Sequence, residues 1–408
     1  MLLTNKTYTQ EAIDTALKIA NEVELRHAKW LVNRKYLLEQ SQVDNLLSLQ
    51  GRYCDDVIFN EDERITRNQR ILLMCEQARV KERNQRVENR QKTLKSVVAD
   101  VTRVAEQMLI QKLNQMPMEK LCGEVADFAH FSSIAYSPSL SFTKLSTLTT
   151  LSHRLSATIV DLVSNPKFCE RLGRQTKNVQ DAKVAIGLLG IENCRMLFPV
   201  LMARPMLKWG DHNTKFIVPK MWQHLIVTSN VTRMRLQDAD IRNPDAGVLI
   251  GVLRCLGQFV IANHFTLTFE DALIEVMLNY RNHDRKEEYY ACADVVANPA
   301  FLPKVIYQME GIVTRRILDS MDWPSNAMYI KDAVLEDLDK VPVLERSSYG
   351  AALAQAKAYS IFDGLSRSNA FVEAHKPFWF ANVQISAQAL KETRARMPGK
   401  MILAGQSL

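Results

Sequence analysis

The most apolar stretch of the chain reads Gly247-Val-Leu-Ile-Gly-Val-Leu-Arg-Cys-Leu-Gly257. Gly247 and Gly251 are four residues apart in it, and in a soluble helix this spacing lets a second helix approach closely. Arg254 interrupts the apolar run after seven residues, whereas a membrane span needs about 20. We therefore expect a helix that packs tightly inside the protein, and a chain that does not cross a membrane.

The whole chain has the composition of an ordinary globular protein. Its 408 residues are 47% hydrophobic and 24% charged, and they include only 14 Gly and 13 Pro. Few glycines and prolines suit long helices joined by short loops, and the length allows roughly two or three domains. The net charge of +7 is a small excess of 52 basic over 45 acidic residues. Such an excess is typical of a soluble surface and is a weak indication of an anionic partner.

Cysteine usage and the N-terminal residues indicate the compartment. The seven cysteines are never closer than 21 residues, so no zinc ribbon or redox CxxC motif is present. Scattered single cysteines are typical of buried small side chains in a reducing compartment. The first residues, Met1 to Lys6, lack the apolar run of a signal peptide. We expect a cytoplasmic protein.

The N-terminal region is expected to contain two helices. The first covers residues 8 to about 50, with Thr9 as its N-cap. The second covers 61–115, a segment without Gly or Pro in which one apolar position recurs every seven residues. These positions are Leu73, Val80, Val87, Leu94, Val101 and Met108. The partner position of a coiled coil is apolar only at Val98 and Ala105. This single stripe therefore either lies along the chain's own N-terminal helix or pairs two copies in a homodimer.

The rest of the chain is expected to be helical too. Residues 131–150 are rich in Ser and Thr and are predicted to be a linker or a loosely packed entry to the next domain. Asn165-Pro166 suits a helix start, and Thr268-Phe-Glu-Asp271 resembles a capping box that would begin another helix. Phe378-Trp-Phe380 is an aromatic cluster that suits a core or a partner anchor. No apolar–polar alternation indicates a strand, so the fold class is all-α. The expected domains are 1–116 with the long charged helix, 117–345, and a C-terminal helical extension over 346–408.

No common catalytic signature occurs in the sequence. The phosphate-binding loop, the dinucleotide-binding glycine motif, the nucleophile elbow and the HExxH zinc motif are all absent. None of the eight histidines lies three or four residues from another, which excludes a two-histidine metal site on one helical turn. The one His-Asp dipeptide, His283-Asp284, lies in a charged run, and we interpret it as a solvated helix end rather than a displaced metal site.

Five segments carry a family resemblance through their order and spacing. They are Ile159-Val-Asp-Leu-Val-Ser-Asn-Pro166, Ala185-Ile-Gly-Leu-Leu-Gly190, Trp222-Gln-His224, the run from Gly247 to Gly257, and Ile317-Leu-Asp-Ser-Met-Asp-Trp-Pro324. Together they resemble the HDOD domain, a bacterial relative of the HD metal-dependent phosphohydrolases. The resemblance implies a compact HD-like helical bundle that follows the long N-terminal helix. It also implies a non-enzymatic role in bacterial signal transduction, in circuits that govern motility, biofilm or cyclic dinucleotides.

The resemblance also locates a degenerate site. Where the phosphohydrolases carry a His-Asp metal-binding pair, this chain has Arg254-Cys255, and an arginine has no lone pair to offer a cation. Glu310 stands near where a further histidine often occurs, and His224, two residues after Trp222, matches a retained ligand position. Arg254, His224, Trp222 and Glu310 are therefore candidates for a vestigial, anion-binding site without metal, cofactor or catalytic residue. Arg254 either forms an internal salt bridge, with Glu310 as a candidate partner, or receives a phosphate or carboxylate. His224 is either a satisfied core histidine or part of a cleft.

We expect a non-enzymatic signalling module that binds a protein partner or a small anionic signal, with a cyclic dinucleotide circuit among the candidates. One alternative is a residual metal-dependent phosphohydrolase with an unorthodox site. Another is nucleic-acid binding through the basic residues of the helix near 64–95. Interleaved glutamates and the absence of aromatic side chains for stacking weaken this last alternative.

Overall fold

The computed structural model describes residues 2–33, 74–123, 125–151, 153–173, 175 and 179–404. These residues contain no β-strand, which confirms the all-α prediction. The α-helices in chain order are α1 (Gln10–Val32), α4 (Met74–Gln115), α5 (Met118–Cys122), α6 (Phe128–Ala135), α7 (Phe142–Leu151), α8 (His153–Ser164), α9 (Pro166–Arg171), α10 (Ala182–Leu189), α11 (Ile191–Ala203), α12 (Val218–Asp238), α13 (Ala246–Asn282), α14 (Lys286–Ala291), α15 (Leu302–Asp319), α16 (Met328–Leu338), α17 (Ser348–Arg367), α18 (Lys376–Asn382) and α19 (Ala387–Ala395). Short 3₁₀ turns are η1 (Arg204–Met206), η2 (Cys292–Asp294), η3 (Pro299–Phe301), η4 (Ser325–Ala327), η5 (Val343–Glu345) and η6 (Glu373–His375).

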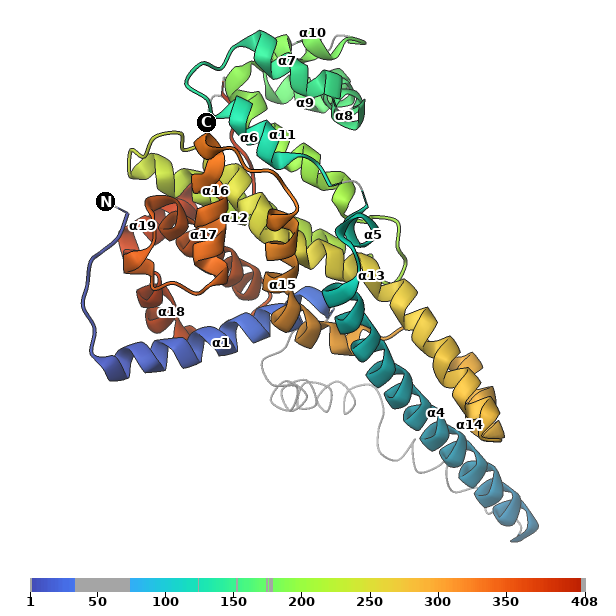
Figure 1. Cartoon of the computed structure of the whole chain (residues 1–408). Coiled ribbons are helices and arrows are strands. Elements are labelled where there is room, and N and C mark those ends of the chain that lie inside the picture. The colour runs from blue at the N-terminus through green and yellow to red at the C-terminus, as the bar shows by residue number, and fades with distance from the viewer. Residues whose placement is uncertain are drawn as a thin grey trace.

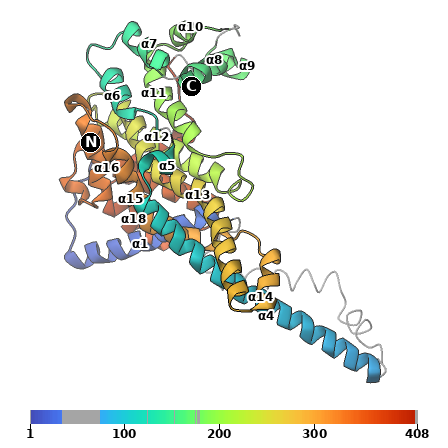
Figure 2. The same ribbon diagram turned by 45° about the vertical axis from the view of Figure 1, so that its right-hand side comes forward.

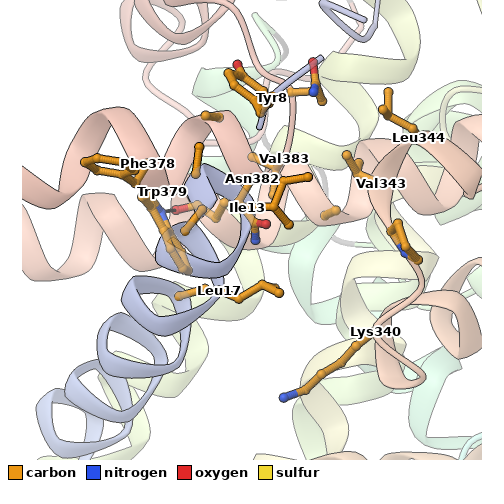
Figure 3. Close-up of a pocket in the computed structure, with 18 of the residues that line it drawn as sticks. Tyr8, Ile13, Leu17, Lys340, Val343, Leu344, Phe378, Trp379, Asn382 and Val383 are labelled. Atoms are coloured by element: carbon orange, nitrogen blue, oxygen red, sulfur yellow. Dashed lines mark hydrogen bonds between the residues drawn. The ribbon is translucent and has the colours of Figure 1, made fainter. Parts of the chain in front are cut away.

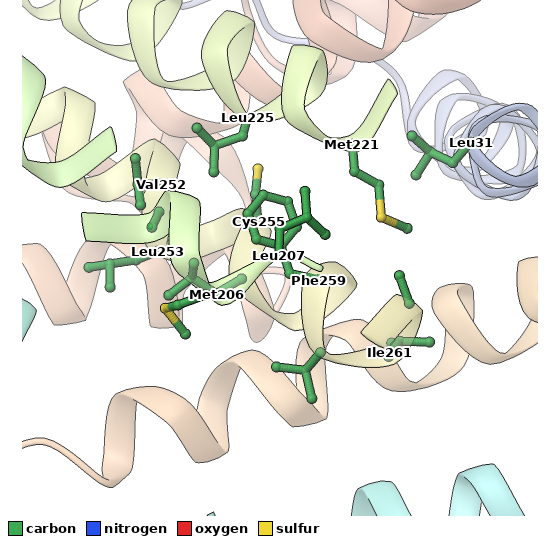
Figure 4. Packing of buried hydrophobic residues seen from close by; sticks show 14 of the residues in the cluster. Leu31, Met206, Leu207, Met221, Leu225, Val252, Leu253, Cys255, Phe259 and Ile261 are labelled. Atoms are coloured by element: carbon green, nitrogen blue, oxygen red, sulfur yellow. The ribbon is translucent and has the colours of Figure 1, made fainter. Parts of the chain in front are cut away.

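Helix α13 runs through the centre of the molecule (Figure 1). Every residue from Ala246 to Ala262 is buried, because α11, α12, α15, α16 and α17 pack around this half. Figure 4 shows Cys255 of α13 among apolar side chains that include Leu225 of α12 and Phe259. The helix that contains the Gly247 run is therefore the core of the fold.

The glycines of α13 allow the close packing that the sequence predicts. A Cβ atom on Gly247 would lie 2.7 Å from the backbone of α12. A Cβ atom on Gly251 would lie 2.4 Å from Cα of Ser229, which also belongs to α12. A Cβ atom on Gly257 would lie 2.3 Å from the carbonyl oxygen of Glu310 in α15. Two neighbouring helices thus approach α13 so closely that a larger residue would have to displace their backbones.

The apolar character of α13 also meets the composition expected of a membrane span. Among the described helices, α13 alone meets this composition. A second candidate exists only if α10 and the segment Ile191–Met206, which are bent by 116° relative to each other, are counted together as one span. In α13, however, 94% of the apolar window is buried inside the protein. A buried core helix has the same composition, so packing accounts for this feature.

Helix α4 lies along the second half of α13 and also contacts α14 and α15 (Figures 1 and 2). Its fully buried residues recur every four positions and are Val97, Val101, Ala105, Leu109 and Leu113. Of the predicted seven-residue stripe, Val101 is fully buried in this half, whereas Leu94 and Met108 are only half-buried. The buried face therefore follows a spacing of four residues rather than seven. The physical reason is that crossing helices interlock along their i, i+4 ridges. This half packs within the chain, as one of the two alternatives predicted, but it lies along α13 and not along the N-terminal helix that the prediction named.

The N-terminal half of α4 extends past α14 (Figures 1 and 2). Val80 and Val87 are exposed there. Leu73 and the rest of 61–73 lie outside the described residues, as do 34–50 of the first predicted helix. The described part of that first helix, α1, begins after Thr9, whose hydroxyl accepts a hydrogen bond from the Ala12 backbone N–H and confirms the predicted N-cap.

Two local predictions were wrong. The Ser/Thr-rich segment 131–150 is not a linker, because it belongs largely to α6 and α7. Its hydroxyls bond to carbonyls of the preceding turn, as Ser132 does to Ala129 at 2.7 Å, so they are satisfied within a helix. Thr268 does not start a helix either, since α13 continues through it and buries its side chain. The predicted helix start at Asn165-Pro166 is confirmed by the Asn165 cap of α9.

Both ends of the chain contribute to the core. Helix α1 packs against α15, α17 and α18, and α17 packs against α12. The Trp30 indole of α1 donates to the Ser368 hydroxyl at 2.8 Å. The expected domain boundary at residue 346 falls between α16 and α17, two helices that pack against each other.

Candidate functional site

Arg254 is the centre of a buried network of ion pairs. Its Nε lies 2.6 Å from Oδ2 of Asp337 in α16, and its Nη2 lies 3.1 Å from Oε1 of Glu310 in α15. The side chains of Arg254 and Asp337 are only 7% and 5% exposed. Arg254 thus forms the internal salt bridge to Glu310 that was one of its two predicted alternatives, and it has a second carboxylate partner.

Further charged residues extend this network from two more helices and a loop. Arg346, which follows η5, places Nη1 2.9 Å from Oδ1 of Asp337. Lys357 of α17 lies 3.6 Å from Oδ2 of Asp337 and 2.7 Å from Oε1 of Glu24 in α1. The charge cluster, as we call it below, consists of Glu24, Arg254, Glu310, Asp337, Arg346 and Lys357. Its three cations and three anions balance.

Mutual attraction keeps the charge cluster ionised in spite of its burial. Burial would raise the pKa of Asp337, but the positive charges of Lys357, Arg254 and Arg346 hold it well below its ordinary value. Burial would likewise raise the pKa of Glu310, and the charge of Arg254 lowers it instead. For Arg254, burial would lower the pKa, and the two carboxylates more than offset that effect. Each charge in the cluster therefore depends on the others.

His224 of α12 lies beside the charge cluster and is paired with a second histidine. Its Nδ1 is 2.8 Å from the hydroxyl of Ser360, and its ring centroid is 4.6 Å from that of His27 in α1. Burial lowers the pKa of His224 well below its ordinary value, and burial with the charge of Lys357 lowers the pKa of His27 to about 3. Both rings are neutral at physiological pH.

A polar cavity of about 540 Å³ opens between these groups. Its lining includes His27, His224, Arg254, Gln258, Glu310 and Lys357. Nε2 of His27 and Oε1 of Gln258 are buried without a hydrogen-bond partner among the described residues. His224 is therefore both a hydrogen-bonded buried histidine and part of a cavity wall. The cavity can bond a small polar group, but its buried charges already have partners.

Trp222 does not join the other candidates. It stacks on Phe259 at 6.2 Å between ring centroids and meets Trp209 edge-on at 5.5 Å, outside the polar cavity. A separation of two residues on an α-helix turns a side chain to nearly the opposite side, so Trp222 and His224 face different neighbours. Three of the four sequence candidates, Arg254, His224 and Glu310, converge.

The other positions considered for metal lie apart from the cavity. Cys255 points into the apolar core (Figure 4), where burial raises the pKa of its thiol to about 12. His283 caps the end of α13 and Asp284 follows it, both exposed, as predicted for a solvated helix end. Among the described residues, no three His, Cys, Asp or Glu side chains form a group that could hold a metal ion.

Sequence reasoning missed most of the charge cluster. Asp337, Arg346, Lys357 and Glu24 lie outside the motifs that carry the family resemblance, as does His27. The one available signal was general, since an arginine in an apolar helix requires anionic partners whose positions periodicity does not reveal.

Comparison with known proteins confirms the resemblance. The family model of the HDOD domain matches residues 128–292. No curated protein and no solved structure matches the chain. The matched segment contains Arg254 and His224, whereas the other five members of the charge cluster lie outside it.

Proposed function

We propose that this chain, which carries an HDOD domain over residues 128–292, is a non-catalytic module of bacterial signal transduction that binds a protein partner in the cytoplasm. The observation that carries the proposal is the state of Arg254. Where the HD phosphohydrolases have their metal-binding pair, this side chain is bound by two carboxylates of its own protein.

The charge cluster disfavours both a metal and a small anion at Arg254. A divalent cation would be repelled by Arg254 and Lys357, and the carboxylates that would attract it are already paired. An anion would have to replace Glu310 or Asp337, which would leave a buried carboxylate without its partner. A protein partner that binds on the outer surface would leave all ion pairs of the charge cluster in place.

An assay for hydrolysis tests the non-catalytic part. The chain, purified without chelator, would be incubated with p-nitrophenyl phosphate, bis-p-nitrophenyl phosphate and cyclic dinucleotides in the presence of Mg²⁺, Mn²⁺ or Fe²⁺. We expect no stoichiometric metal and no turnover above that of a blank without the chain, because the described part of the chain holds no ligand set to activate water. Metal-dependent turnover that increases in proportion to the bound metal would reject the proposal.

Partner binding is tested in the source organism. Proximity labelling with the tagged chain should repeatedly identify the same signalling proteins, and these should bind the purified chain directly. If repeated experiments recover only abundant housekeeping proteins, the scaffold proposal fails even when the hydrolysis assay is negative.

The N-terminal half of α4 adds self-association to the proposal. Val80 and Val87 are 41% and 49% exposed and lie one heptad apart, which suits a weak pairing with a second copy. Arg86 and Arg90 are ion-paired with Glu82 and Asp294, which reduces the charge left for nucleic acid.

Sedimentation equilibrium measures this association. We expect a concentration-dependent dimer that a Val80→Asp, Val87→Asp variant converts to monomer. Val184→Asp, which alters a valine that is 53% exposed on α10, should leave the dimer intact. A monomer at all concentrations, or equal effects of both substitutions, would contradict pairing through α4.

A further inference from the structure

An apolar groove of about 660 Å³ lies beside the charge cluster, away from the positions that the family resemblance points to. Its lining comes from α1, α17 and α18, from the N-terminal residues 6–8, and from the loop that leads through η5. Figure 3 shows Ile13 and Leu17 of α1 near Trp379 of α18, with Val343 and Leu344 on the opposite side. Glu24, Asp337 and Lys357 of the charge cluster line both this groove and the polar cavity.

The groove combines small side chains in its lining with large apolar side chains that remain exposed. Ala12, Ala16 and Ala20 follow each other at helical spacing along α1 and leave the space open. The exposed large side chains are Tyr8 at 41%, Ile13 at 39%, Leu17 at 49%, Leu344 at 51% and Phe378 at 37%. Single exposed apolar residues are ordinary, but a cluster of them around one concave site is typical of a binding site.

The charge without a partner at this groove is positive. Two exposed lysines, Lys6 and Lys340, line it, and their ammonium groups have no hydrogen bond or ion pair with the described residues. The acidic residues of the lining, Glu24 and Asp337, are already paired with Lys357 and with arginines. An anion is therefore the charged group that the groove would attract.

The backbone holds both lysines in place. The Lys6 N–H donates to Oε1 of Gln384 at 3.1 Å, and Nε2 of Gln384 donates to the Lys6 carbonyl at 2.8 Å. Lys340 sits in a left-handed turn with φ 54° after α16, and its N–H donates to the Asp337 carbonyl at 3.2 Å. The two lysines thus belong to segments whose backbone is fixed by hydrogen bonds at the edge of the groove.

We propose that the groove binds an amphiphilic small molecule with an apolar chain and one anionic group, such as a long-chain carboxylate. The apolar chain lies against the alanines of α1 and the ring of Trp379, and the positive charges of Lys6 and Lys340 attract the carboxylate. The volume falls within the roughly 300–1,000 Å³ of small-molecule sites. A small molecule fits better than a partner's helix because residues 6–8, α1, α18 and the η5 loop border the groove on several sides. This site is independent of partner binding by the HDOD domain.

Isothermal titration calorimetry of the full chain with dodecanoate, kept below its micelle-forming concentration, tests the site. We expect saturable binding of one dodecanoate per chain, and binding of dodecylammonium that is about five- to tenfold weaker because of the two lysines. Lys340→Glu should weaken dodecanoate binding by a similar factor and bring the two probes closer in affinity. Equal or tighter binding of dodecylammonium by the unmodified chain would overturn the proposal, as would absence of saturable dodecanoate binding, which would leave the groove to a protein partner.

A pair of matched leucines tests the location. Leu17→Glu introduces a negative charge into the groove and should weaken dodecanoate binding about tenfold or more. Leu278 on α13 is exposed to a similar extent, 46% against 49%, and lies outside the groove, so Leu278→Glu should bind dodecanoate normally. Equal affinities of the two variants would place any dodecanoate elsewhere and reject this site. Circular dichroism of both variants establishes that they are folded.

Discussion

Replacing Arg254 by methionine leaves Asp337 and Glu310 in a buried site without their principal shared cation. We expect the free energy of unfolding to fall by about 3–5 kcal/mol, the usual cost of breaking a buried ion pair by removing one partner. Urea unfolding followed by circular dichroism measures the change. Arg315→Met is the control, because its pair with Asp339 is 39% and 56% exposed and should contribute less than about 1 kcal/mol. If both variants lost a similar free energy of unfolding, the charge cluster would not stabilise the fold more than an exposed ion pair does.

His27 and His224 should make the protein sensitive to mild acid. Both have lowered pKa values in the folded state, about 3 for His27, whereas an unfolded histidine has a pKa of about 6.5. Above pH 6.5 both states are unprotonated and these residues contribute no pH dependence. Below pH 6.5 the unfolded state binds protons that the folded state excludes. As the pH is lowered, the free energy of unfolding therefore decreases by up to about 1.4 kcal/mol per pH unit for each histidine.

Urea midpoints at pH 7, 6 and 5 measure this dependence. A His27→Gln variant should show a shallower decline than the unmodified chain. The exposed His130→Gln should behave like the unmodified chain, and an unchanged slope in His27→Gln would contradict the assignment.

At the residue scale, the sequence predicted the centre of the site but not its surroundings. Arg254 and Glu310 were identifiable because the family resemblance aligned them with lost ligands. Lys357 and Glu24 were not, since they join the charge cluster through Asp337 and through each other, from α17 and α1, more than a hundred residues from Arg254 in either direction. Helical periodicity indicates which face of a helix is buried, but it does not say which helix covers that face.

At the scale of the element, replacing two glycines of adjacent helices by alanine should change the stability of the protein in opposite directions. Gly257→Ala places a Cβ atom 2.3 Å from the Glu310 carbonyl and 2.5 Å from the Thr314 hydroxyl, so α13 and α15 must separate. We expect a loss of about 1–3 kcal/mol or more from this overpacking. Gly311→Ala, on α15, meets only Leu338 at 3.6 Å and should gain up to about 1 kcal/mol from higher helix propensity. Thermal unfolding of both variants decides the matter, and a tolerated Gly257→Ala would contradict the close approach of the two helices.

The helices themselves were more predictable than their packing. Caps such as Thr9 and Asn165 depend on a few neighbouring residues, so the sequence identified them. The pairing of α4 with α13 depends on the i, i+4 ridge from Val97 to Leu113, of which the sevenfold spacing identifies only Val101 and Ala105. The prediction of a linker over the Ser/Thr-rich segment 131–150 was wrong. A helix whose hydroxyls bond to its own carbonyls has the same Ser and Thr content as a loop.

At the scale of the whole molecule, the matched HDOD segment lacks partners that its central helix requires. Arg254 lies inside 128–292, and its carboxylate partners lie outside. The faces of α13 covered by α4, α15, α16 and α17 would also be exposed in that segment alone. We therefore expect the cooperative unit to extend from α1 to α17, across the domain boundaries expected from the sequence.

This extent predicts how fragments behave. A fragment of residues 128–292 should show no cooperative urea transition, because it exposes the apolar surface of α13 and leaves Arg254 without carboxylates. A fragment of 118–404 regains α15, α16 and α17 and should unfold cooperatively. Its urea midpoint should be lower than that of the full chain, since it lacks the buried face of α4 and the α1 side chains of Glu24, His27 and Trp30. Circular dichroism at matched concentrations measures all three proteins. A 128–292 fragment as stable as the full chain would show that α13 needs none of its partners from outside the family match, and that the charge cluster does not hold the fold together.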